Sequence, residues 1–182
     1  NLIDRSQDEG LMKENAPGTT GLVAVTGATG YVGGRLVPRL LQSGLAVRCV
    51  VRHAEKLEYR PWRNEVEVIE ADLSVPDQVL NALNGAQAAY YLVHSMNSSE
   101  DFEELELRMA EIFAESAAAA DLNQIVYLGG LGHDSERHSA HLASRHRVGI
   151  ALAEGGTPVT ELRAAVIIGS GSASFEMLRS LV

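Results

Sequence analysis

The stretch AVTGATGYVGGRLVPRLL, residues 24–41, constrains the fold most, because four glycines fall where an apolar run gives way to a helical pattern. Gly27 directly follows the apolar run, Gly30 lies in the expected turn and Gly33 in the first helical turn, which gives G-x-x-G-x-x-G. Such glycines permit a tight turn, close backbone approach to a pyrophosphate, and close packing of helix on strand. The helix start also offers N–H groups and partial positive charge to phosphate. The pattern predicts a dinucleotide-binding loop, with a purely structural turn as the alternative.

Short apolar runs alternate with helical patterns from Gly21 onward. The expected strands cover residues 22–26, 46–51, 66–72, 88–93, 124–130 and 158–168. Strict alternation of this kind is typical of a parallel sheet covered by helices on both faces. Right-handed crossovers then favour a Rossmann-type, doubly wound α/β fold with strand order 3-2-1-4-5-6.

Composition limits the size and the partners of the protein. With 182 residues, 46% of them hydrophobic, we expect a flexible tail at residues 1–20 and a single domain at residues 21–182. A net charge of -9 argues against nucleic acid or a membrane surface as a partner. No apolar run reaches the roughly 20 residues that a membrane helix needs. The single cysteine, Cys49, cannot form a disulfide within the chain, which favours a reducing, cytoplasmic setting.

The end of the second expected strand indicates which dinucleotide is bound. Proteins that select NAD usually carry Asp or Glu there, to accept hydrogen bonds from the ribose 2′-hydroxyl. This chain has Arg52 instead, followed by His53 and Lys56. Because positive charge suits a 2′-phosphate, the sequence favours NADP over NAD, which stays possible. A solvated basic loop is the alternative.

Two further polar residues lie at strand ends. Asp72 could accept a hydrogen bond from the adenine amino group, or it could cap the next helix. His94 ends the fourth strand, at the crevice where the strand order reverses, and could contact the cofactor ribose. A polar residue at a strand end with no ligand is the alternative for His94.

The segments TGATGYVGGRLV, VVR, ADL, IVYLGGLG and LRAAVIIGSGS, in this order, resemble the short-chain dehydrogenase/reductase superfamily. They are most similar to its atypical and extended members, the NmrA-like and nucleotide-sugar-epimerase-like NAD(P)-binding proteins. The resemblance implies a cofactor lying across the strand ends. The cofactor-binding residues it implies are Gly27, Thr29, Gly30, Tyr31, Val32, Gly33, Arg52, Asp72, Leu73, Leu92, Val93, His94 and Ile167.

The catalytic positions depart from the superfamily pattern. Its members use a Tyr-x-x-x-Lys pair on the helix after the fifth strand, where this chain has His141 and Arg145. The usual serine is also absent, because Gly129 and Gly130 end the fifth strand. A histidine can exchange protons near neutral pH, and an arginine can hold a ribose hydroxyl, so altered chemistry is conceivable. A metal centre is not expected, because the histidines of this region mix loop and helix and lack an acidic partner. They are His133, His138, His141 and His146.

The sequence therefore supports two main hypotheses. The first is an NADP-dependent oxidoreductase acting on a small-molecule substrate, whose C-terminal substrate portion lies beyond the end of this domain. The second is a non-catalytic NADP-binding redox sensor or regulator that binds a protein partner, favoured by the missing Tyr, Lys and Ser. A structural protein that has lost the ligand is opposed by the intact glycines. A homodimer could form through the helix around residues 102–120 and the helix after the fifth strand, as in many members of the superfamily.

Overall fold

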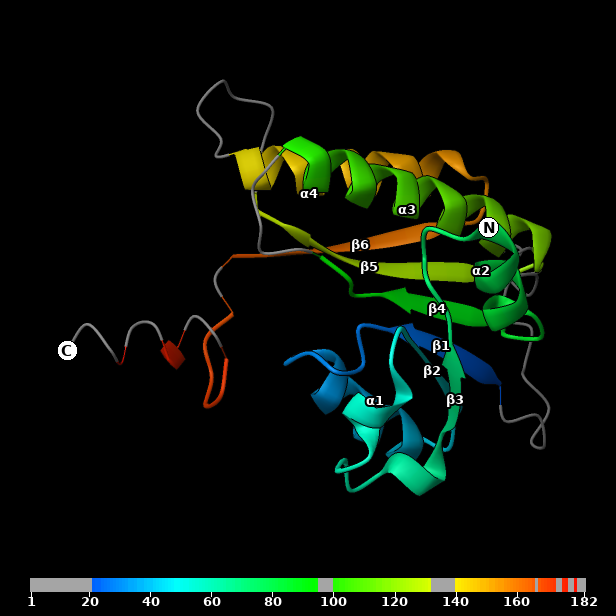
Figure 1. Cartoon of the computed structure of the whole chain (residues 1–182), viewed down its shortest axis with the longest axis vertical. Helices are drawn as coiled ribbons and strands as arrows, with labels where there is room; N and C mark the ends of the chain where they lie inside the picture. The colour runs from blue at the N-terminus through cyan, green and yellow to red at the C-terminus, as the bar shows by residue number, and fades with distance from the viewer. Residues whose placement is uncertain are drawn as a thin grey trace, which may run out of the picture.

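The computed structural model describes residues 21–94, 100–131, 140–165, 167–172, 175–176 and 179. Its centre is one parallel sheet of six strands with the order β3-β2-β1-β4-β5-β6 (Figure 1). The strands are β1 (Leu22–Thr26), β2 (Ala46–Val51), β3 (Glu67–Glu70), β4 (Ala88–Tyr91), β5 (Gln124–Gly130) and β6 (Val159–Ala164). The expected doubly wound fold and its strand order are confirmed. The expected tail at residues 1–20 lies outside the described residues.

Helices cover both faces of this sheet (Figure 1). On one side lie α2 (Pro76–Leu83), α3 (Glu100–Ala119) and α4 (Ala140–Glu154). On the other side lie α1 (Gly33–Gln42) and the connection between β2 and β3, which contains the short 3-10 helices η1 (Ala54–Leu57) and η2 (Arg63–Glu65). None of the helices in the described part of the chain is long and apolar enough to cross a bilayer.

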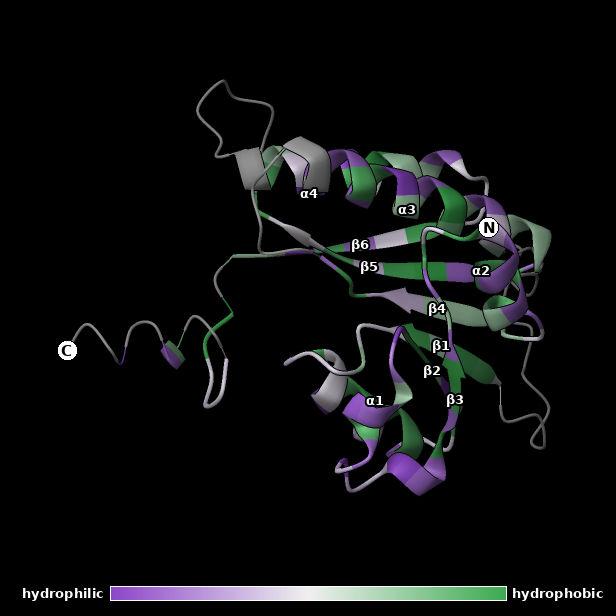
Figure 2. Cartoon of the chain, in the orientation of Figure 1, coloured by the Kyte–Doolittle hydropathy of each residue, from purple (hydrophilic) through white to green (hydrophobic). Residues whose placement is uncertain are grey.

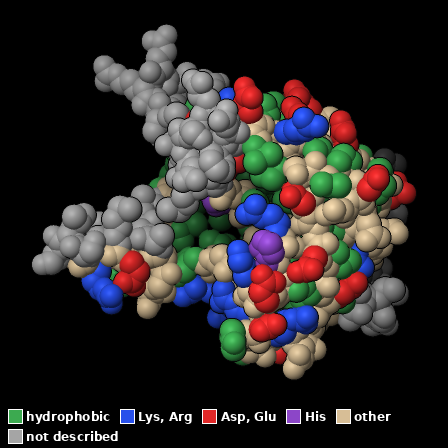
Figure 3. Space-filling model, viewed as in Figure 1, with side chains coloured by type: hydrophobic (Ala, Val, Ile, Leu, Met, Phe, Trp, Pro, Cys, Tyr) green, Lys and Arg blue, Asp and Glu red, His purple; other side chains and the backbone are tan. Residues whose placement is uncertain are grey.

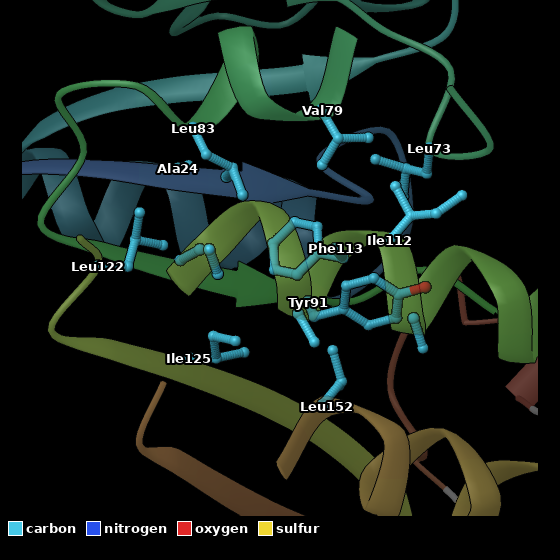
Figure 4. Close-up of a cluster of buried hydrophobic side chains, with 14 of the residues drawn as sticks. Ala24, Leu73, Val79, Leu83, Tyr91, Ile112, Phe113, Leu122, Ile125 and Leu152 are labelled. Atoms are coloured by element: carbon cyan, nitrogen blue, oxygen red, sulfur yellow. The ribbon is translucent and has the colours of Figure 1, made fainter. Parts of the chain in front are cut away.

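Each face of the sheet has its own hydrophobic core. The larger core lies between the sheet and α2, α3 and α4, where the rings of Tyr91 and Phe113 meet edge to face at 4.9 Å (Figure 4). The smaller core lies under α1 and includes Val25, Val37 and Cys49. Figure 2 shows the consequence: the central strands are mostly hydrophobic, whereas the connection between β2 and β3 is mostly hydrophilic. Because β1 is buried on both faces, it forms a rigid floor for the loop that follows it.

Three strands end earlier than the apolar pattern predicts. β3 ends at Glu70 instead of residue 72. β4 ends at Tyr91, so residues 92–94 lie beyond the sheet edge, and β6 ends at Ala164 instead of continuing to residue 168. The helix ends follow the expected glycines, since Gly44 after α1 and Gly85 after α2 have φ values of 79° and 76°. These early strand ends leave irregular backbone at the carboxyl edge of the sheet, where ligands bind in folds of this class.

Candidate nucleotide-binding site

The glycine-rich loop, residues 27–33, is shaped by contacts that only glycine permits. Gly27 has a φ of 71°, and a Cβ there would lie 2.8 Å from the carbonyl oxygen of Leu92. A Cβ on Gly33 would collide with the carbonyl oxygen of Gly27 and lie 2.8 Å from the Cα of Ala28. The N–H of Gly30 donates to the carbonyl of Gly27 at 3.0 Å and closes the turn. The loop therefore packs against the segment that follows β4 on one side and against the start of α1 on the other.

The start of α1 offers unused hydrogen-bond donors. Its N-cap, Val32, provides no side-chain cap, and its first turn contains no acidic residue. Among the described residues, no hydrogen bond uses the backbone N–H of Tyr31 or Val32. Exposed amides at a helix N-terminus, beside a turn without side chains, form a binding site for a diphosphate. The residues present thus fit the pyrophosphate of a dinucleotide.

Thr26 joins the two strands that flank the point where the strand order reverses. Its fully buried hydroxyl donates to the carbonyl of Tyr90 at 3.1 Å and accepts from the N–H of Leu92 at 3.2 Å. The side chains of Leu92 and Val93 pack against the smaller and the larger core respectively. Of the predicted residues after β4, only the half-buried His94 therefore has a polar side chain to offer, and a cofactor would meet Leu92 and Val93 mainly through their backbone.

Arg52 follows β2 directly, and its side chain is exposed. β2 pairs with β1 up to Thr26 and Val50, so Arg52 lies at the strand end next to the glycine-rich loop. No ion pair among the described residues involves Arg52. Figure 3 shows a hollow at this carboxyl edge of the sheet, with basic and histidine side chains along the rim. Positive charge is therefore available beside the loop.

Asp72 does not cap α2, so that expectation is wrong. The N-cap of α2 is Val75, and the Asp72 carboxylate instead accepts from the N–H and the hydroxyl of Ser74, at 2.9 and 2.7 Å. These hydrogen bonds, with a smaller effect of the Arg52 charge, lower the pKa of Asp72. Leu73 is buried in the larger core, so its side chain does not face solvent. Asp72 remains ionised and exposed at the edge where adenine binding is predicted.

Two arginines beside the loop escaped the sequence analysis. Arg60, from the connection between β2 and β3, donates from Nη2 to the carbonyl of Thr29 at 2.7 Å. Arg35, on α1, lies 3.7 Å from the centre of the Tyr31 ring and donates to the carbonyl of Ser170 at 2.7 Å. No sequence pattern predicts the contacts with Thr29 and Ser170, because these partners are 31 and 135 residues from their arginines.

The chain beyond β6 reaches the glycine-rich loop. A Cβ on Gly169 would collide with the Tyr31 hydroxyl, so the two segments are in direct contact. Ile167, predicted to lie near the cofactor, belongs to this segment and is exposed. Tyr31 and Arg35 also border an open groove of about 700 Å³ along α1. The segment after β6 therefore lies beside the predicted diphosphate site.

At the end of β5, neighbouring side chains pack closely against the two glycines. A Cβ on Gly130 would lie 2.9 Å from Cδ2 of Leu142 and 3.2 Å from Cδ of Arg145. A Cβ on Gly129 would collide with the carboxylate of Glu161. The space that a serine would take at either position is thus filled by side chains from α4 or β6. Arg145 is half-buried, and its Nε is buried without a hydrogen bond among the described residues.

Two buried tyrosines, Tyr127 and Tyr91, lie in the larger core on this part of the sheet. The Tyr127 hydroxyl donates to the Arg145 carbonyl at 2.9 Å, and burial raises the pKa of both Tyr127 and Tyr91 well above its usual range. Glu106, buried between α3 and α4 and bonded by the Ser144 hydroxyl at 3.1 Å, raises both pKa values further. The raised pKa values favour the protonated form of both hydroxyls, and both rings pack in the larger core.

The remaining predicted residues of this region are only partly described. His141 lies in the first turn of α4, but its side chain, like all of His133 and His138, lies outside the described residues. No cluster of three metal-ligating side chains occurs in the part of the chain that the structure describes. The arrangement of His141 relative to Arg145 stays a prediction.

The geometry agrees with sequence comparison. A family described as NAD(P)H-binding matches residues 27–163, more than half of the chain. The chain belongs to this family. The resemblance to atypical members of the short-chain dehydrogenase/reductase superfamily is confirmed by the same match and by the structures that share the fold.

This chain matches only part of the length of each relative. The ceramide reductase of Caulobacter vibrioides is 35% identical over 103 residues, covering 55% of this chain and 32% of that protein. The photosystem II assembly factor Ycf39 of Cyanophora paradoxa is 28% identical over 119 residues, which cover 64% of this chain and 36% of that protein. The crystal structure of Citrobacter sp. triphenylmethane reductase complexed with NADP(H) shares the fold, with a TM-score of 0.69 and 24% identity. The match covers 87% of this chain and 53% of the reductase. The chain thus spans about half of that structure and about a third of the two curated relatives.

Proposed function

We propose that this chain is the cofactor-binding part of an NADPH-dependent reductase that transfers hydride to a small-molecule acceptor without a tyrosine acid. The observation that carries the proposal is the glycine-rich loop, with free amides at Tyr31 and Val32 and an unpaired Arg52 at the adjacent strand end. Relatives with reductase names, and an NADP(H) complex on the same fold, support it. The substrate and the reaction direction belong to the whole protein and are part of the proposal.

Arg52 is the residue proposed to select NADP(H). Its guanidinium would bind the 2′-phosphate, Asp72 would accept from the adenine amino group, and His94 would contact the nicotinamide-side ribose. A guanidinium matches phosphate geometry, whereas a ribose 2′-hydroxyl is better held by a carboxylate, which this position lacks. A cytoplasmic setting is proposed with this role, because the single cysteine is buried and unpaired.

When bound, NADPH supplies a hydride, and the acceptor then takes a proton. Arg145 is proposed to donate hydrogen bonds to a developing negative charge on the acceptor. Its Nε, which has no hydrogen-bond partner among the described residues, supports this proposal. His141, one helical turn earlier, is proposed to supply the proton near neutral pH. Such a site suits acceptors that need charge stabilisation more than a strong acid.

The experiment that tests this function follows NADPH oxidation by the full-length protein, with carbonyl and quinone acceptors. Arg145→Met should lower kcat at least tenfold while the Kd for NADPH changes less than threefold, and Arg145→Lys should recover part of kcat. His141→Gln should shift the pH profile of kcat. Turnover that is unchanged in both Arg145→Met and His141→Gln would contradict the proposed roles.

A second candidate, a non-catalytic NADP(H)-binding regulator with a protein partner, is favoured by the filled serine position. The similarity to an assembly factor supports it as well. Tight NADPH binding without oxidation of NADPH by any acceptor, together with partner capture only when NADPH is present, would favour the regulator. A homodimer through α3 and α4 remains a proposal for either candidate.

A further inference from the structure

The connection between β2 and β3, residues 52–66, carries four arginine and lysine side chains and three glutamates. Arg52, Lys56 and Arg60 lie within nine residues, and none of them forms an ion pair with a described residue. The chain as a whole has a net charge of -9, so acidic partners are abundant elsewhere. Cations without a direct ion-pair partner beside a phosphate-binding loop are suited to bind an anionic ligand.

Arg60 is the member of this group whose position is fixed. It is half-buried, and its Nη2 donates to the carbonyl of Thr29 at 2.7 Å. Its Nη1 would lie 3.0 Å from a Cβ on Gly34, so the guanidinium lies directly against the first turn of α1. The other guanidinium N–H groups have no partner among the described residues and are not buried. They are free to bind a ligand from the solvent side.

The Arg60 guanidinium is held in place by one carbonyl, while its other N–H groups stay accessible to solvent. A bound phosphate would replace water at these N–H groups with charge-assisted hydrogen bonds. The location agrees, because Thr29 is two residues beyond Gly27 at the end of β1, and Arg52 follows the neighbouring strand β2.

We propose that Arg60 is a second 2′-phosphate-binding residue, which holds the phosphate against Arg52 while its bond to Thr29 fixes the glycine-rich loop. This inference rests on the proposed preference for NADP(H). It adds a specificity-determining residue that comes from the middle of a long connection and not from a strand end. The diphosphate is left to the amides of Tyr31 and Val32.

The test is a set of binding titrations of the whole chain with NADPH, NADH and adenosine 2′,5′-bisphosphate. The variants are Arg60→Ala and Arg60→Gln, because glutamine removes the charge but keeps an amide that can donate to Thr29. Arg108→Ala is the matched control, since Arg108 is an exposed arginine on α3, across the sheet from the loop. Circular dichroism and thermal melting verify that each variant is folded.

We expect the ratio of Kd(NADH) to Kd(NADPH) to fall at least tenfold in both Arg60 variants and to stay within twofold of wild type in Arg108→Ala. Binding of adenosine 2′,5′-bisphosphate should weaken by a similar factor and lose part of its dependence on salt, while the Kd for NADH changes less than threefold. An unchanged ratio, or an equal loss for NADH and NADPH, would overturn the inference, and the equal loss would assign Arg60 to the diphosphate or to loop structure.

The wild-type titration separates this inference from the proposed function. A wild-type ratio above ten with no change in the Arg60 variants rejects the role of Arg60 and leaves the NADPH preference intact. A wild-type ratio near one rejects the NADPH preference, and the role of Arg60 falls with it. Absence of NADPH oxidation, with a ratio that depends on Arg60, rejects the reductase and keeps the phosphate site.

Discussion

The two ends of the sheet's carboxyl edge differ in how closely they follow the superfamily pattern. At β1 and β2, Gly27 and Gly33 meet backbone atoms that cannot move away, and the free amides of α1 lie beside them. At β5 and β6, Gly129 and Gly130 instead meet side-chain ends from Glu161, Leu142 and Arg145. Nucleotide binding depends on backbone shape, which tolerates little change, whereas catalytic chemistry depends on side chains that can be exchanged while the fold is kept.

The largest expected effect comes from exchanging glycine for alanine at each end. Gly33→Ala places a methyl group against the Gly27 carbonyl and the Ala28 Cα, so the loop must open. We expect at least a hundredfold loss of NADPH affinity by isothermal titration. Gly130→Ala meets only the ends of the Leu142 and Arg145 side chains, which can shift, so NADPH affinity should stay within threefold. Equal losses of NADPH affinity in the two variants would contradict the difference between the two ends of the sheet edge.

A smaller effect is expected from Thr26→Val, which keeps the shape of the side chain but removes the hydroxyl that joins β1 to residues 90–92. The buried N–H of Leu92 and carbonyl of Tyr90 each lose a partner. We expect about 1–3 kcal/mol of lost stability in urea unfolding, because an unsatisfied buried group costs roughly that much. Ser43→Ala, which removes an exposed hydroxyl bonded to the Arg39 carbonyl, should cost no more than about 0.5 kcal/mol.

Much of the nucleotide end could be predicted from the sequence, because its signals are local. The glycine spacing, the strand before it and Arg52 all fall within 31 residues, from Leu22 to Arg52. The contacts of Thr26 and Arg60 could not be predicted, since their partners are 64 and 31 residues away and depend on the folded sheet. Asp72 was ambiguous because an acidic residue before a helix can cap it or, as here, bond to the turn in front of it.

At the β5 end, the sequence predicted only that the usual catalytic residues are missing. The missing Tyr, Lys and Ser are visible in the sequence, but what fills their space depends on the packing of α4 and β6. Glycine at residues 129 and 130 suggested a lost catalytic group, whereas the structure shows room made for Glu161 and Arg145. The role of Arg145 in turnover stays a prediction.

Tyr127→Phe tests whether the buried tyrosine at the β5 end is only structural. The variant loses the hydrogen bond to the Arg145 carbonyl, so we expect a loss of about 1 kcal/mol in unfolding free energy. NADPH affinity should be unchanged, and the pH profile of turnover in the full-length protein should not move. A shifted pH profile would show that Tyr127 takes part in proton transfer.

The effect that is smallest at neutral pH concerns Cys49, in the core under α1. Burial raises the pKa of this thiol from 9.0 to about 12, so the folded protein retains a proton that the unfolded chain releases. Stability should therefore fall as the pH rises from 9.0 towards 12, and urea unfolding should show a shallower decline in Cys49→Ala. Parallel declines in the two proteins would mean that the thiol is accessible and that the core beneath α1 is looser than described.

A crystal structure of the chain with NADPH at saturating concentration tests the central claim most directly. We predict the diphosphate on the backbone N–H groups of Tyr31 and Val32, and the 2′-phosphate at Arg52. A loop that stays without nucleotide, or a nucleotide bound elsewhere on the chain, would contradict the account.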